Sequence, residues 1–167
     1  MFEKLCKSSS DINEHLPTLR DLATDCKHVT EMGVRYIVST WAFIEGNPKT
    51  LVSIDIKHPS YYGGDISEVE RVCTEKGIDF TFIESDSRKV KLNKTDLLFI
   101  DTDHTYELLK EELSLHGGNV KKYIVLHDTV SCKDEIMPAI EEFLAKGVWK
   151  VYKHYENNNG LMVLSKC

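Results

Sequence analysis

The chain has 167 residues, of which 41% are hydrophobic and 29% charged, and its formal net charge is −6. These values predict one globular domain with a single core, and the negative charge argues against non-specific binding to nucleic acid or to an anionic membrane, because both need a basic patch. The sequence shows no apolar run of the roughly 20 residues that span a bilayer, no apolar signal-peptide core and no Cys-x-x-Cys pair. We therefore expect a cytoplasmic protein with reduced thiols.

The first half of the chain predicts a helix followed by alternating strands and helices. Leucines and other apolar residues at helical spacing indicate an amphipathic helix over residues 11–26, with Pro17 marking a break or the true first turn. After it, apolar runs and turn residues predict strands at 28–33, 51–55 and 78–84 and helices at 34–44 and 66–76, the last closed by Gly77.

The second half continues this alternation and ends differently. It predicts strands at 97–100 and 123–126, helices at 106–115 and 136–145, the latter beginning at or just before Pro138, and a terminal strand pair at 148–154 and 161–165. Strands that alternate with helices form a doubly wound, mainly parallel sheet, and the polar turn between the last two strands indicates an antiparallel β-hairpin. We predict an α/β fold made of an N-terminal helical segment, residues 1–27, packed on a domain of residues 28–167.

Acidic residues follow the predicted strands, at the point where each strand ends. The carboxyl ends of parallel strands meet at one edge of a sheet, where ligands bind in open α/β folds. Carboxylates gathered there repel one another unless a ligand, a cation or a hydrogen-bond donor compensates them. The sequence therefore predicts a ligand site formed by Glu31, Asp55, Asp86, Asp101 and the pair His127-Asp128.

The densest group of ionisable residues follows the strand at 97–100. Asp101, Asp103 and His104 lie within four residues, which indicates a catalytic or binding site. The alternative is that Asp103 or Thr105 only caps the next helix. Capping explains neither Asp101 nor His104, so we favour the site.

The loop after the first strand distinguishes between cofactors. It contains one glycine, Gly33, whereas the pyrophosphate of NAD or FAD needs a loop with several. An amino-acid-like tail, whose carboxylate meets the Ser39 hydroxyl, fits this loop better. Asp55 follows Gly33 by about 20 residues, the usual spacing of an acid that accepts both ribose hydroxyls, and Asp86 is suited to accept from an adenine amine.

Together these motifs resemble class I S-adenosylmethionine-dependent methyltransferases, and more closely the group that includes metal-dependent sugar O-methyltransferases and cephalosporin hydroxylase-like proteins. The resemblance extends from the first strand to the last and implies a Rossmann-like methyltransferase fold. It rests on five motifs: Glu31-x-Gly33-Val34-Arg35, Ser53-Ile54-Asp55, Ser85-Asp86-Ser87, Ile100-Asp101-x-Asp103-His104 and Leu126-His127-Asp128. The chain departs from the group at Ile37, where a second glycine is usual.

The resemblance implies S-adenosylmethionine as the methyl donor and S-adenosylhomocysteine as the product. It places Glu31, Gly33 and Ser39 at the methionine part, Asp55 at the ribose and Asp86 at the adenine. The full set of implied cofactor contacts is Glu31, Gly33, Val34, Arg35, Ser39, Asp55, Ile56, Asp86, Ser87 and Asp101.

The resemblance also implies the chemistry. His104 matches a general base, and Asp101, the second residue assigned to catalysis, matches an acid that binds a divalent metal. The predicted reaction is O-methylation of a small-molecule or sugar hydroxyl. Asp101, His127 and Asp128 match the ligands of a divalent metal, but His127 replaces a carboxylate. Magnesium prefers oxygen ligands whereas imidazole suits Zn, Fe or Mn ions, so a different metal or a metal-free site is expected.

Two other functions remain open from the sequence. One is a binding module that holds S-adenosylmethionine without catalysis. The other is a metal-dependent hydrolase that uses Asp101, Asp103, His104, His127 and Asp128 and needs neither Asp55 nor Asp86. The chain lacks long insertions that would cover an acceptor, so we expect the cover to come from the N-terminal helix, the 57–65 loop or a second subunit of a homodimer.

Overall fold

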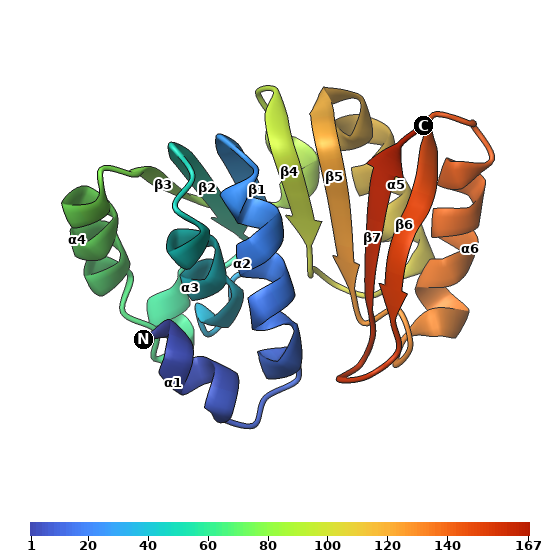
Figure 1. The fold of residues 1–167 in the computed structure, drawn as a ribbon. Helices are drawn as coiled ribbons and strands as arrows, with labels where there is room; N and C mark the ends of the chain where they lie inside the picture. The colour runs from blue at the N-terminus through green and yellow to red at the C-terminus, as the bar shows by residue number, and fades with distance from the viewer.

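Seven strands form one sheet in the order β3-β2-β1-β4-β5-β7-β6 (Figure 1). The computed structural model describes all 167 residues. Strands β1 to β5 run parallel, whereas β7 is antiparallel to both of its neighbours, β5 and β6. The strands are β1 (His28–Met32), β2 (Thr50–Asp55), β3 (Asp79–Glu84), β4 (Thr95–Ile100), β5 (Val120–His127), β6 (Trp149–Tyr155) and β7 (Leu161–Lys166).

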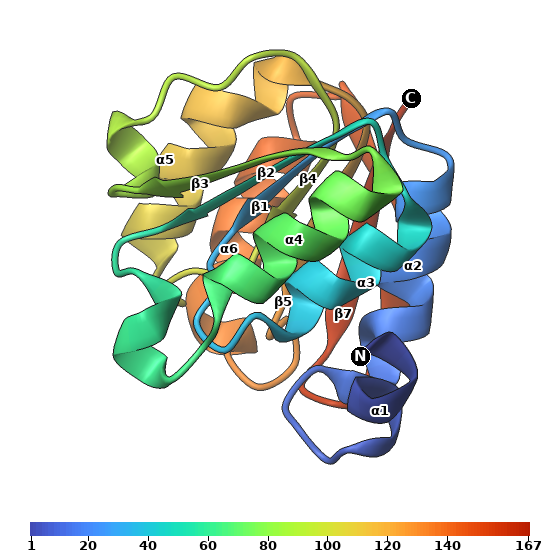
Figure 2. The ribbon, with the colours of Figure 1, turned by 90° about the vertical axis from the view of Figure 1, so that its left-hand side faces the viewer.

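Helices cover both faces of this sheet, as Figures 1 and 2 show. On one face, a core of 21 buried residues lies under α1 (Phe2–Lys7), α2 (Leu16–Thr24), α3 (Val38–Gly46) and α4 (Ile66–Lys76). On the other, a core of 17 buried residues lies under α5 (Tyr106–His116) and α6 (Lys133–Leu144). The predicted doubly wound sheet with a terminal antiparallel hairpin is confirmed. No helix has the length and apolar character that a membrane span requires.

The ends of the central strands are level with one another. In the register of the sheet, Met32 of β1 pairs with Ile54 of β2 and with Ile100 of β4, and Ile100 pairs in turn with Leu126 of β5. The residues that follow these positions therefore leave the sheet side by side. This register brings the predicted site residues to one edge.

The local signals for α2 and α4 are confirmed. Pro17 lies in the first turn of α2, where its missing amide leaves no hydrogen bond unmade. The Asp65 side chain accepts the Ser67 amide at the start of α4, and Gly77 ends that helix with φ +70°. The predicted helix over 11–26 is in part a 3-10 turn, η1 (Asn13–His15), and the sequence analysis missed the short helix α1.

Two predicted helix starts are wrong. Helix α3 begins at Val38, not at residue 34, because residues 34–37 form a turn in which Arg35 and Ile37 have positive φ. Helix α6 begins at Lys133, and Pro138 lies inside it. Pro138 is the sixth residue of this helix and removes one hydrogen bond, a loss that the acidic first turn and the buried apolar face of α6 offset.

Gly33 lets the loop after β1 approach the loop after β4. Its φ is +86°, and a Cβ built there would lie 1.9 Å from the Asp101 carbonyl oxygen. The two backbones could not pack this closely with any side chain between them.

We predict that Gly33→Ala lowers the free energy of unfolding much more than Gly77→Ala. Gly77 also has positive φ (+70°), but a Cβ there meets nothing within 4 Å, so Gly77→Ala should cost only the conformational strain of about 1–2 kcal/mol. Gly33→Ala adds the backbone clash and should cost at least about 2 kcal/mol more. Urea unfolding of both variants measures the difference. Equal losses would show that the two loops are not in contact.

Candidate active site

A cavity of about 360 Å³ opens at the carboxyl edge of the sheet. Its walls come from the loops after β1 to β5 and from the chain between α1 and α2. Most of the predicted site residues line it, namely Gly33, Val34, Arg35, Ser39, Asp55, Ile56, Asp86, Ser87, Asp101, His104 and Asp128. Glu31 and His127 lie outside this lining, and each is held by other residues of the site.

Glu31 is fully buried between β1, β2 and α3. Its carboxylate accepts hydrogen bonds from Ser39 (2.5 Å), Thr40 (2.8 Å) and Ser53 (2.7 Å). Burial raises the pKa of Glu31 to about 7, against the lowering effect of these hydroxyls. Because the Ser39 hydroxyl donates to Glu31, it is left as an acceptor toward the cavity. Glu31 therefore fixes the first turn of α3 from below.

Asp55 connects the end of β2 to the loop after β1. One carboxylate oxygen accepts the amides of Val34 (2.7 Å) and Arg35 (3.0 Å), and the other accepts the Lys57 amide (3.0 Å). These bonds explain why the turn at 34–37 does not continue as helix. They also hold the carboxylate in the cavity wall.

Asp86 is paired with an arginine that the sequence analysis did not select. Arg88 donates through Nε (2.9 Å) and Nη2 (2.7 Å) to the two carboxylate oxygens, and its amide donates to one of them (3.0 Å). These bonds lower the pKa of Asp86 to about 2. Arg88 itself lines the cavity. A ligand that reaches Asp86 therefore meets a guanidinium beside the carboxylate.

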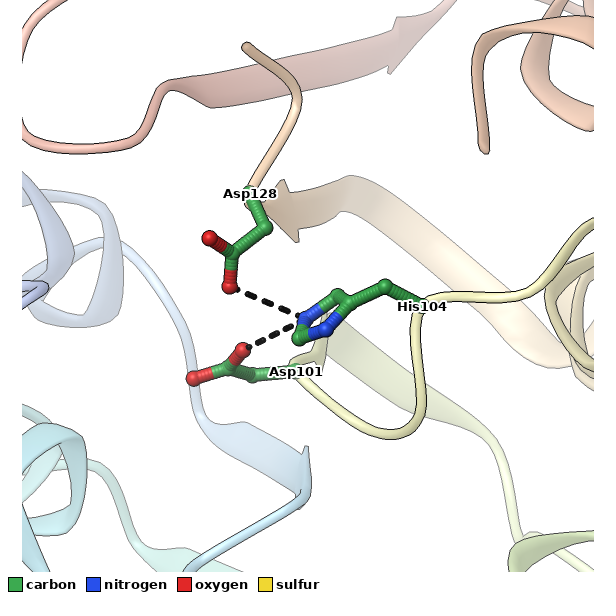
Figure 3. A group of neighbouring side chains, drawn as sticks. All are labelled: Asp101, His104 and Asp128. Atoms are coloured by element: carbon green, nitrogen blue, oxygen red, sulfur yellow. Dashed lines mark hydrogen bonds and ion pairs between the residues drawn. The ribbon is translucent and has the colours of Figure 1, made fainter. Parts of the chain in front are cut away.

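His104 lies between two carboxylates (Figure 3). Its Nε2 is 3.3 Å from Asp101 Oδ1 and 2.9 Å from Asp128 Oδ2. The hydrogen bonds to Asp101 and Asp128 raise the pKa of His104 to about 10. Burial opposes ionisation of Asp101, but its bonds to His104 and His127 outweigh that effect and lower its pKa.

The buried side chain of His127 contacts the same two carboxylate oxygens. Its Nδ1 is 3.2 Å from Asp101 Oδ1 and 3.0 Å from Asp128 Oδ2. Its Nε2 lies 3.1 Å from the carbonyl oxygen of Asp11. Burial disfavours a charge on this imidazole, yet the two carboxylates raise the pKa of His127 to about 10. We call Asp101, His104, His127 and Asp128 the histidine–aspartate cluster.

Asp128 has an unusual backbone conformation. Its φ is +57°, a region that non-glycine residues rarely enter. Ser131 donates to its other carboxylate oxygen, Oδ1, which leaves Oδ2 directed at the histidines. Strained residues of this kind gather at functional sites, where their surroundings hold them in place.

Two further groups shape the site, and the sequence analysis missed both. Glu112 of α5 is fully buried and accepts from Ser87 (2.6 Å) and Thr102 (2.9 Å), which ties two cavity loops together. In the sequence it resembles any acid on the polar face of a helix. Asp11 lines the cavity and pairs with Arg35 at 2.7 Å. The only available signal for it was its place in a short polar stretch before α2.

No family model and no curated protein sequence matches the chain. Solved structures do match it. A Staphylococcus aureus protein described as a caffeoyl-CoA O-methyltransferase has a TM-score of 0.70 at 13% identity, over 92% of this chain and 83% of that one. The Bacillus cereus O-methyltransferase in complex with S-adenosylhomocysteine has a TM-score of 0.65 at 15% identity, over 92% and 81%. The B. subtilis tRNA methyltransferase TrmK has a TM-score of 0.60 at 14% identity, over 92% and 65%.

These matches identify the architecture. The chain has the fold of the class I S-adenosylmethionine-dependent methyltransferases, as its resemblance to them implied. At identities this low the similarity concerns the fold alone. The acceptors named for these structures also differ, so the chemistry of this chain has to be argued from its own side chains.

The raised pKa of Glu31 predicts a specific pH dependence of stability. Between pH 4.5, the ordinary value, and about pH 7, the folded chain keeps a proton on Glu31 that the unfolded chain has lost. The free energy of unfolding therefore falls as the pH rises through this window, by up to about 1.4 kcal/mol per unit. Glu31→Gln removes this contribution.

Urea unfolding of wild type and Glu31→Gln at pH 5 and pH 8 tests this prediction. The advantage of the wild type over the variant should be larger at pH 5 by about 2 kcal/mol. Glu70→Gln, at an exposed position of α4, controls for the loss of a carboxylate. If the advantage is the same at both pH values, Glu31 does not titrate as described.

Proposed function

We propose that the chain is an S-adenosylmethionine-dependent methyltransferase that binds its cofactor in the cavity. The observation that carries this proposal is the composition of the cavity wall. Nine of the ten residues that the resemblance assigns to the cofactor line one cavity, and Glu31 holds one of those nine, Ser39, by a hydrogen bond. The match to a methyltransferase in complex with S-adenosylhomocysteine supports the same proposal.

The cofactor would lie across the ends of β1, β2 and β3. Its methionine part faces Gly33 and Ser39, its ribose faces Asp55, and its adenine faces Ile56 and the 85–88 loop. The amides of Val34, Arg35 and Lys57 occupy three of the roughly four acceptor positions of the Asp55 carboxylate, so one position, on Oδ1, can accept a ribose hydroxyl. Ser87 also lines the cavity, and its hydroxyl is held by a hydrogen bond that it donates to Glu112.

The acceptor would be a small-molecule or sugar hydroxyl placed over the histidine–aspartate cluster. The transfer is an in-line displacement: the hydroxyl oxygen forms a bond to the methyl carbon while the carbon–sulfur bond breaks, and S-adenosylhomocysteine leaves. The sulfonium is already a good leaving group, so the protein chiefly positions the two reactants. The hydroxyl proton has to be removed, and His104, which lines the cavity, is the base we assign.

The negative charges of Asp101 and Asp128 limit the conditions under which His104 can act as a base. A pKa of about 10 means that the ring holds a proton near neutral pH as long as no other cation neutralises Asp101 and Asp128. The carboxylates of Asp101 and Asp128 offer donor oxygens within 4.8 Å of one another, which fits a divalent ion, whereas His104 is not counted as a ligand because a base needs its lone pair free. When bound, such an ion supplies positive charge that leaves His104 unprotonated and lowers the pKa of the hydroxyl.

We predict that the purified protein binds S-adenosylhomocysteine with a micromolar dissociation constant. Asp55→Ala should weaken this binding at least tenfold, or by about 1.4 kcal/mol, because the variant loses the ribose acceptor. Calorimetric titration measures both. Glu70→Ala on the exposed face of α4 should bind as the wild type does. Absence of binding by the folded wild-type protein would reject the methyltransferase and favour the metal-dependent hydrolase.

We also predict that His104→Ala separates binding from chemistry. The variant should bind S-adenosylhomocysteine as the wild type does and transfer methyl groups at least about 100-fold more slowly, the usual contribution of a general base. Release of S-adenosylhomocysteine from S-adenosylmethionine, in the presence of a panel of sugars, phenols and catechols, measures the transfer.

Two results would revise the assignment. Full activity in His104→Ala would remove His104 as the base. A wild-type protein that binds the cofactor tightly but methylates no hydroxyl in the panel would favour the non-catalytic binding module or an acceptor of another class.

A further inference from the structure

Helix α5 holds the loop of residues 85–88, which we call the adenine loop because the proposed function places the adenine there. His116 Nε2 donates to the Ser87 carbonyl oxygen at 3.0 Å, and Glu112 accepts the Ser87 hydroxyl at 2.6 Å. Glu112 and His116 are both buried, and their spacing of four residues puts them on one face of the helix. The position of the adenine loop is therefore set by α5.

Glu112 also binds the loop of residues 101–105, which we call the His104 loop. Its second carboxylate oxygen accepts the Thr102 hydroxyl at 2.9 Å. Thr102 lies between β4 and α5, two residues before His104, and both residues line the cavity. One buried side chain thus connects the two loops, with one hydrogen bond through each of its oxygens.

The His104 loop continues directly into α5. Thr105 caps this helix by accepting the Leu108 amide (3.4 Å), so the helix begins only two residues after His104. The His104 loop is therefore joined to α5 through the chain and through Thr102, and the adenine loop is joined to it through Glu112 and His116. Both loops take their positions from the same rigid helix.

The proposed methyl transfer gives Glu112 no direct role. Its side chain does not line the cavity, and its hydrogen bonds come from two neutral hydroxyls. A buried carboxylate without a cation beside it is costly. Burial accordingly raises the pKa of Glu112, against the lowering effect of the two hydroxyls. An apolar residue at this position would avoid the cost but would connect neither loop.

We propose that Glu112 is a positioning residue that couples the two ends of the site: adenine bound at the adenine loop fixes the His104 loop through Glu112 and Thr102. A ligand that orders one loop also restricts a second loop that is hydrogen-bonded to it. Correct placement of the base matters because a displacement of about 1 Å can lower a rate about 100-fold. The coupling rests on the proposed methyltransferase function and adds to it how cofactor binding regulates His104.

Nuclear magnetic resonance of the histidine rings tests the coupling without an acceptor. The probe is adenosine, which lacks the amino-acid part of the cofactor. His104→Ala identifies the ring signals of His104, because they are absent from its spectrum. Saturation of the wild-type protein with adenosine, at one fixed pH, should change the chemical shifts of these signals.

Two variants each cut the connection at a different point. Glu112→Met keeps a side chain of similar length without hydrogen-bonding oxygens, and Thr102→Val removes one hydroxyl. In both variants the response of the His104 signals to adenosine should be lost. Adenosine should still bind, because His116 continues to hold the Ser87 carbonyl. Circular dichroism verifies that each variant is folded.

A conservative variant separates hydrogen bonding from charge. The Glu112→Gln side chain can accept from one hydroxyl and donate to the other, so its His104 signals should respond to adenosine as those of the wild type do. Glu70→Gln, at an exposed position of α4, controls for the loss of a carboxylate and should also respond fully.

The transfer reaction gives a second measurement. Glu112→Met and Thr102→Val should lower kcat at least about tenfold and leave the KM for S-adenosylmethionine unchanged, because the base is displaced while the cofactor still binds. Glu112→Gln should restore the wild-type kcat. A purely structural role would lower the free energy of unfolding of these variants without changing the kcat of the folded protein.

Three results would overturn the coupling: no change of the His104 signals in the wild type saturated with adenosine, a full response in Glu112→Met and Thr102→Val, or wild-type kcat in both variants. Each of them leaves the methyltransferase proposal intact as long as the protein binds S-adenosylhomocysteine. A folded wild-type protein that binds neither adenosine nor S-adenosylhomocysteine would reject the methyltransferase, and the coupling with it.

Discussion

Asp101 connects the loops at the carboxyl edge of the sheet through its amide, its carbonyl and its carboxylate. Its amide donates to Met32 at the end of β1, its carbonyl packs against Gly33, and its carboxylate oxygen contacts the imidazoles of both His104 and His127. The loops after β1, β4 and β5 meet at this residue. The cavity keeps its shape because Asp101 contacts these loops through its backbone as well as through its side chain.

Buried carboxylates support this edge from below. Glu31 sits under the loop after β1, and Glu112 lies under the loops after β3 and β4; each is satisfied by serine and threonine hydroxyls. No buried side-chain nitrogen or oxygen lacks a partner. An unpaired buried carboxylate would be costly, but satisfied networks of this kind hold a site rigid before any ligand arrives.

The N-terminal segment lies against the same edge. Asp11 reaches Arg35 with its side chain and His127 with its carbonyl. His15 is buried against the carbonyls of Asn157 and Asn158 in the hairpin loop. Asp11 and Ile12 line the cavity together with Tyr62 of the 57–65 loop. Residues of these two segments therefore form part of the cavity wall.

The sheet and the edge at which the site lies could both be predicted from the amino-acid sequence. Strand β4 is a short apolar run, and α2, α4 and α6 each have one apolar face, so local periodicity indicates which of their residues are buried. Polar residues just after each strand must then collect at one edge, because parallel strands end there. Gly33, Asp55, Asp101 and His104 could be selected on these grounds alone.

The hydrogen-bond partner of each of these side chains became known only from the folded chain. Asp55 bonds to amides 20 and 21 residues away, and His127 to a carbonyl 116 residues away. Those amides hold residues 34–37 in a turn, so α3 begins at Val38 rather than at 34. The sequence analysis did not select Arg88 and Glu112, because their roles also depend on hydrogen-bond partners that only the fold brings near them. The periodicity of a sequence predicts whether a residue is buried. It does not predict the hydrogen-bond partner of that residue, because the partner comes from a distant part of the chain that the fold places beside it.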